Sequence, residues 1–92
     1  MIKSFKHKGL ETFFSTGSTK GIQANHARKL RLILDLLDEA EQVEEMNFQG
    51  ANLHQLKGDL LNHWSVKVNG NWRVTFKFEN SDAEVVDYQD YH

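Results

Sequence analysis

The chain has 92 residues, which is enough for one domain, and we expect that domain to span residues 1–92. It has no cysteine, which excludes a disulfide framework or a thiolate metal site and fits a cytoplasmic protein, and no apolar run approaches the roughly 20 residues of a membrane span. Its net charge of −2 argues at first against nucleic acid as a partner.

A short strand and a short helix are predicted at the start of the chain. Residues Ile2 to Lys6 read as a strand. The apolar residues that follow have i, i+3, i+4 spacing, which predicts a short amphipathic helix: Leu10, Phe13 and Phe14. Gly17 marks the end of this helix, and the composition of Ser15–Gly21 predicts a loop.

The longest predicted helix covers about Asn25 to Glu41. Its apolar residues lie along one face: Ala27, Leu30, Ile33, Leu34 and Leu37. Six of the thirteen acids lie between Asp35 and Glu45, so the rest of the chain carries eleven bases against seven acids. Two interpretations stay open. This acidic segment is either a solvated helix face or a back surface that is separated from a basic working face.

Strands that follow one another along the chain are predicted for the second half. The segment Val43–Asn52 reads as an irregular or short helical connection. Alternation with period two predicts strands at Trp64–Val68, Trp72–Phe78 and Ala83–Tyr88. Two helices followed by a meander of strands predict an α+β fold in which two N-terminal helices pack on a twisted, mainly antiparallel sheet.

The first predicted hairpin brings two cations together. A three-residue loop around Gly70 makes these pairs, whose six members share an apolar face: Val68 with Trp72, Val66 with Val74, and Trp64 with Phe76. The same register places Lys67 opposite Arg73 on the other face. Like charges directly opposite one another are destabilising unless an anion lies between them, so the pair is a candidate phosphate site.

The second predicted hairpin closes with a two-residue turn at Asn80–Ser81. Its register makes these pairs: Phe78 with Ala83, Phe76 with Val85, Lys77 with Glu84, and Arg73 with Tyr88. Tyr91 would then point to the apolar side unless the strand bulges, and Asp87 would point into the core, which hints at a break. The expected constellation on the polar face is Lys67, Arg73, Tyr88, Asp90 and His92.

Such a constellation suits the handling of RNA. Cleavage of RNA requires a proton acceptor for the 2′-OH, a cation for the phosphate and a proton donor for the leaving oxygen, but no metal. The planar fork of Arg73 suits a phosphate, and His92 can donate or accept a proton near neutral pH. Tyr91 or Tyr88 offers a ring on which an unpaired base can stack. The five histidines match no metal-ligand spacing, so we expect neither a metal nor another cofactor.

Several motifs, in this order and spacing, resemble one family. They are Leu56-Lys-Gly-Asp59, Trp64-Ser65, Asn71-Trp-Arg73, Phe76 and Asp90-Tyr-His92, preceded by the segment Met1–Leu10. Over nearly its whole length the chain resembles the HigB-type toxins of bacterial toxin–antitoxin pairs, within the RelE superfamily. The resemblance implies a small RelE-like fold and a ribosome-dependent, metal-independent endoribonuclease that cuts mRNA in the decoding A site.

The resemblance also implies partners and residue roles. The partners would be a helix-turn-helix antitoxin of the HigA type, the 70S ribosome and mRNA, with operator DNA bound through the antitoxin. The roles carried over by residue are proton transfer by His54, Asp90 and His92, stabilisation of the phosphate by Lys57 and Arg73, and orientation of the substrate by Tyr91. Which of the three proton-transfer residues is the base stays open.

Two functions of other classes also stay open. A non-enzymatic inhibitor that occupies the ribosome, or a co-repressor that acts with the antitoxin, would keep the basic face but would not need Asp90 or His92. An interaction module would instead dock its acidic helix on a basic partner and would depend on Asp38, Glu39 and Glu41.

Overall fold

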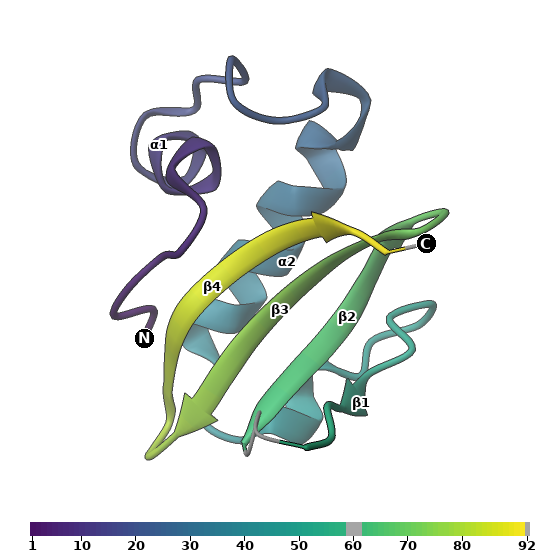
Figure 1. Ribbon diagram of the computed structural model, residues 1–92. Helices are drawn as coiled ribbons and strands as arrows, with labels where there is room; N and C mark the ends of the chain where they lie inside the picture. The colour runs from purple at the N-terminus through teal and green to yellow at the C-terminus, as the bar shows by residue number, and fades with distance from the viewer. Residues whose placement is uncertain (59–61, 92) are drawn as a thin grey trace.

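The computed structural model describes residues 1–58 and 62–91 and contains an antiparallel sheet with helices behind it (Figure 1). The helices are α1 (Lys8–Thr16) and α2 (Ala27–Glu39), with the 3₁₀ turns η1 (Ala24–His26) and η2 (Val43–Met46). The four strands are β1 (His54–Gln55), β2 (His63–Asn69), β3 (Trp72–Glu79) and β4 (Asp82–Asp90), and they lie in the sheet in chain order. The predicted α+β class with an antiparallel sheet is confirmed. Strand β1 was not predicted, because two residues are too few to show alternation.

The two faces of the sheet differ. In Figure 1, α2 lies behind the sheet and α1 lies beside β4, while no described helix covers the face toward the viewer, which we call the open face. The core lies between α2 and the sheet, where these residues are fully buried: Leu30, Ile33, Leu34, Leu37, Val66, Val74 and Phe76. No described helix is long and apolar enough to cross a membrane.

Helix α1 has a defined start and stop. The Nδ1 of His7 accepts a hydrogen bond from the Leu10 amide at 3.0 Å, which caps the first turn. Gly17 takes a φ of +83°, and its amide donates to the Phe13 carbonyl at 2.8 Å. The helix therefore ends at Gly17, as predicted. Glycine suits this position because it adopts the left-handed conformation without steric cost.

The segment before α1 lies along the free edge of β4. It makes two isolated parallel bridges, Ile2 with Ala83 and Phe5 with Val86, where a strand over Ile2–Lys6 was predicted. The amides of Lys3 and Lys6 donate to the carbonyls of Ala83 and Val86 at 2.7 and 2.8 Å. The segment therefore covers an edge that would otherwise expose its backbone hydrogen-bonding groups.

The first hairpin has the predicted register except at its tip. Lys67 pairs with Arg73, and two apolar pairs are also as predicted: Val66 with Val74, and Trp64 with Phe76. The predicted pair of Val68 and Trp72 is wrong, because Asn69 pairs with Trp72 and an irregularity lies between Lys67 and Asn69. Val68 is nevertheless 7% exposed, so the local bulge keeps it in the core.

The second hairpin has the predicted turn but not the predicted register beyond it. Phe78 pairs with Ala83 and Lys77 with Glu84, as predicted. The predicted pairs of Phe76 with Val85 and of Arg73 with Tyr88 are wrong. The structure makes these pairs instead: Thr75 with Asp87, Val74 with Tyr88, Arg73 with Gln89, and Trp72 with Asp90. One extra residue in β4, at Val85–Val86, produces this shift.

The bulge exchanges the two faces of the rest of β4. Tyr88, predicted on the polar face, is 4% exposed and lies in the core. Asp90, predicted beside Arg73, pairs with Trp72 and so belongs to the helix side. Tyr91 comes to the open face, as its alternation requires once a bulge is present. The sequence did indicate a break in this strand, because regular alternation would have turned the carboxylate of Asp87 into the core.

The bulge depends on an unusual backbone conformation and on the N-terminal segment. Val85 has a φ of +47°, at a bulge position where glycine is the usual residue. Its amide donates to Ser4 Oγ at 2.9 Å, and the Val86 amide donates to the Ser4 carbonyl at 3.1 Å. These bonds hold a conformation that costs about 1–3 kcal/mol for a β-branched residue.

Adjacent glycine substitutions test the bulge. We expect Val85→Gly to leave the free energy of unfolding within about 1 kcal/mol of wild type, because relief of the strain offsets the lost packing and the added chain entropy. Val86→Gly should lower it by at least about 2 kcal/mol, because Val86 is fully buried. Urea denaturation measures the free energy of unfolding of both variants. Equal decreases in the two variants would contradict backbone strain at Val85.

Candidate active site

Polar side chains from all four strands form two rows across the open face. Cross-strand pairing aligns the first row: His54, Ser65, Thr75 and Asp87. It aligns the second row in the same way: Lys67, Arg73 and Gln89. Residues between these positions, such as Val66 and Val74, are buried in the core, so alternation directs both rows away from the helices.

Lys67 and Arg73 are the two opposed cations of the second row. Both are half-buried, and Arg73 Nη1 donates to the Oγ of the fully buried Ser65 at 3.3 Å. Within residues 1–58 and 62–91, neither cation forms an ion pair. Two opposed cations without a carboxylate between them favour the binding of an anion, and the guanidinium can contact two phosphate oxygens at once.

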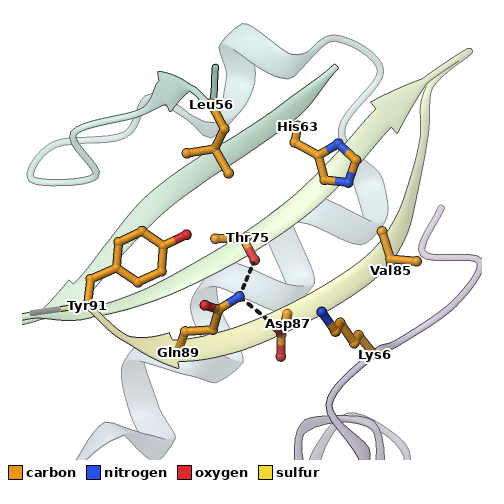
Figure 2. Close-up of a pocket in the computed structure, with 8 residues that line it drawn as sticks. All are labelled: Lys6, Leu56, His63, Thr75, Val85, Asp87, Gln89 and Tyr91. Atoms are coloured by element: carbon orange, nitrogen blue, oxygen red, sulfur yellow. Dashed lines mark hydrogen bonds between the residues drawn. The ribbon is translucent and has the colours of Figure 1, made fainter. Parts of the chain in front are cut away.

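A pocket of about 450 Å³ opens on the same face, and one of its lining residues, Gln89, is the cross-strand neighbour of Arg73. Figure 2 shows its lining residues: Lys6, Leu56, His63, Thr75, Val85, Asp87, Gln89 and Tyr91. Leu56 follows β1 and Tyr91 follows β4, which are the two outer strands of the sheet, yet both line the same pocket. The open face is therefore hollowed at this place.

The polar groups of the pocket form a short hydrogen-bonded network. Gln89 Nε2 donates to Asp87 Oδ2 at 2.7 Å and to Thr75 Oγ1 at 3.4 Å, as Figure 2 shows. Asp87 Oδ1 accepts from the Tyr88 amide at 2.9 Å. No site role was predicted for Asp87 or Gln89, because a strand without the bulge places both side chains on the helix side.

The structure brings only some of the predicted site residues together. His54 is exposed on the open face, in the row that contains Ser65, and its Nδ1 lies 3.3 Å from the Asn52 carbonyl. Tyr91 lines the pocket. Asp90 is exposed on the opposite side of its strand, and Lys57 is exposed beyond the end of β1. His92 lies outside the described residues.

The chemistry that this face can perform follows from its groups. Lys67 and Arg73 can balance the charge of a phosphate, His54 can carry a proton, and the ring of Tyr91 can meet a planar base. In the described part of the chain, no three histidine or carboxylate side chains gather as they would around a metal ion.

Tyr88 anchors β4 on the helix side. Its hydroxyl lies 2.5 Å from Nδ1 of the buried His26, and its ring centroid lies 4.6 Å from that of Trp72. Burial raises the pKa of Tyr88 above its ordinary value of 10.0, the negative charge of Asp90 adds to the rise, and a hydrogen bond with the backbone of Gln23 opposes it. Tyr88 is therefore a structural residue and offers no ring to an RNA base.

The substitution Tyr88→Phe tests this anchor. At about pH 8 it should lower the free energy of unfolding by about 1–2 kcal/mol, because buried His26 loses its partner. Above about pH 10, wild type should lose stability, because its folded state holds the Tyr88 proton more tightly than the unfolded state does.

The difference between the two proteins should therefore shrink as the pH rises. Urea denaturation at about pH 8 and about pH 11 measures it. A difference that stays constant or grows would contradict the raised pKa.

Two comparisons with known proteins give the same family name. A family model described as "RelE-like toxin of type II toxin-antitoxin system HigB" matches residues 3–92. The protein named Endoribonuclease HigB from Proteus vulgaris is 47% identical over 92 residues, which cover 100% of both chains.

Proposed function

Since this chain belongs to the HigB family of RelE-like toxins of type II toxin–antitoxin systems, we propose that it is an endoribonuclease that cleaves mRNA in the A site of the ribosome. One observation carries the proposal: Lys67 and Arg73 lie opposite one another on the open face without an ion pair in the described chain, beside a pocket that Tyr91 lines. The full-length relative named as an endoribonuclease supports the same activity.

The proposed reaction uses the 2′-OH of the RNA as its nucleophile. A base removes the 2′-OH proton, the 2′-oxygen forms a bond to phosphorus, and the bond from phosphorus to the 5′-oxygen breaks as an acid protonates that oxygen. The products are a 2′,3′-cyclic phosphate and a 5′-OH. Arg73 and Lys67 balance the charge that grows on the phosphate oxygens in the transition state.

We propose that His54, Asp90 and His92 transfer the protons. Asp90 stands on the helix side at the end of β4, so it would act from the rim of the site and not from the open face. His54 lies in the row next to Arg73, which suits a group that acts close to the phosphate. Asp90 and His92 flank Tyr91 in the sequence, and Tyr91 would orient the substrate from the pocket. Lys57, which follows β1, would add positive charge to the phosphate site.

The ribosome would supply what the free protein lacks. The net charge of −2 gives little general attraction to RNA, which binds proteins mainly through its phosphates. The catalytic candidates His54 and Asp90 are exposed, so the site encloses little of its substrate. The ribosome would hold the mRNA in the A site in a fixed position. The protein itself would then need less binding energy to place the scissile phosphate at its catalytic groups.

We extend the proposal to fold and partners. Residues 1–92 would form one domain of the RelE-like type, with the RNA site on the face of the sheet that lies opposite α2. Membership of a type II toxin–antitoxin family implies an antitoxin partner. We propose a helix-turn-helix antitoxin of the HigA type, through which the pair would bind its operator DNA.

Arg73→Ala tests the phosphate site. Induced expression of wild type should arrest bacterial growth, while Arg73→Ala should relieve the arrest and lower cleavage at least about a hundred-fold, because a transition-state contact is lost. Its fold should persist, since within residues 1–58 and 62–91 the side chain of Arg73 makes a single hydrogen bond, which is long at 3.3 Å. The control Arg28→Ala, at an exposed site on α2, should still arrest growth. Arrest by a folded Arg73→Ala protein would refute the role of Arg73.

Cleavage of a defined mRNA tests ribosome dependence. Primer extension should find new 5′ ends when the purified protein meets mRNA on 70S ribosomes, and none when the same RNA is free. The fragments should carry 5′-OH and 2′,3′-cyclic phosphate ends. Equal cleavage of free RNA would contradict the need for the ribosome. Inhibited translation without any cleavage would favour a non-enzymatic inhibitor.

A further inference from the structure

We propose that the pocket on the open face binds an unpaired nucleobase next to the scissile phosphate, and that Gln89 makes it prefer bases that carry an exocyclic amine over uracil. This inference rests on the proposed function, because it assigns a base-recognition role to part of the same face. It concerns Gln89, Asp87 and Thr75, which have no role in the phosphate chemistry described above.

The place and lining of the pocket fit a base. Tyr91 and Leu56 supply an aromatic ring and an apolar side chain, which are the surfaces on which an unpaired base stacks. Gln89 is the cross-strand neighbour of Arg73. A base in this pocket is therefore adjacent to a phosphate held by Arg73 and Lys67.

Asp87 fixes the orientation of the Gln89 amide. A carboxylate oxygen can only accept, so the amide group 2.7 Å from Asp87 Oδ2 must be the NH₂ end of Gln89. Thr75, which is 5% exposed, holds the same nitrogen from the next strand. In Figure 2 the carbonyl oxygen of Gln89 consequently lies on the side of Tyr91.

That carbonyl oxygen is the group that reads the base. Within residues 1–58 and 62–91 it accepts no hydrogen bond, while both oxygens of Asp87 accept one. An exocyclic amine, as on adenine or cytosine, can donate to it. Uracil has no amine. Its single ring N–H can donate, but the carbonyl oxygens on both sides of it repel the oxygen of Gln89 and make that hydrogen bond weaker than one from an amine.

Binding of nucleotides tests the pocket without the ribosome or the reaction. AMP, CMP and UMP are titrated separately into the purified protein, and the NMR signals of the Gln89 amide and the Tyr91 ring are followed. AMP and CMP should bind about two- to ten-fold more tightly than UMP, which is the worth of one net hydrogen bond. Equal affinities, or no shift of these signals by any nucleotide, would overturn the proposal.

Variants of the network assign the preference to Gln89. Gln89→Met keeps the length of the side chain and removes the carbonyl, so it should bind all three nucleotides equally. Thr75→Val keeps its shape but releases the amide, so it should reduce the preference in part. The control Glu84→Gln, on the same strand outside the pocket, should keep it. A Gln89→Met protein that retains the preference would contradict the proposal.

Mapping of cleavage sites separates this inference from the proposed function. On ribosomes, wild type should cut next to amine-bearing bases more often than next to uracil, and Gln89→Met should lose this bias while it still cuts. If the wild-type protein cuts no mRNA, the proposed function is wrong. The nucleotide titrations still test whether the pocket prefers amine-bearing bases. A wild type that cuts with the same base distribution as Gln89→Met would overturn the inference.

Discussion

One extra residue in β4 decides which side chains form the core and which form the open face. A strand alternates its side chains, so the bulge at Val85–Val86 reverses the faces of every later residue. The left-handed conformation of Val85 is unfavourable, and two hydrogen bonds to Ser4 hold it. A residue near the N-terminus therefore helps to arrange a site that is built largely from the C-terminal strand.

Beyond the bulge, core and site are built from alternate residues of the same strand. Tyr88 packs against Trp72 and His26, while Asp87 and Gln89 on either side of it line the pocket. A change that loosens Tyr88 would therefore also move the pocket residues. This arrangement gives the pocket a firm support, because a core residue stands between its two polar groups.

Much of the fold was predictable because its signals are local. The glycine stop at Gly17, the alternating strands and the turn at Asn80–Ser81 depend on residues close in sequence, and the structure contains all three. The bulge was not predictable, because a valine seldom takes positive φ and Ser4 lies far from Val85 in the sequence. The predicted pair of Lys67 and Arg73 was correct, since it precedes the bulge, whereas Tyr88 and Asp90 were placed on the wrong face.

The face of the protein that contacts mRNA can be identified by crosslinking. A photo-crosslinking amino acid can replace Lys77, on the open side of β3, or Asp35, exposed on α2 behind the sheet. Each variant is bound to 70S ribosomes that carry an mRNA whose 2′-OH groups are removed in the A-site codon. Crosslinks to the mRNA are expected from position 77 and none from position 35, and the opposite pattern would contradict an RNA site on the open face.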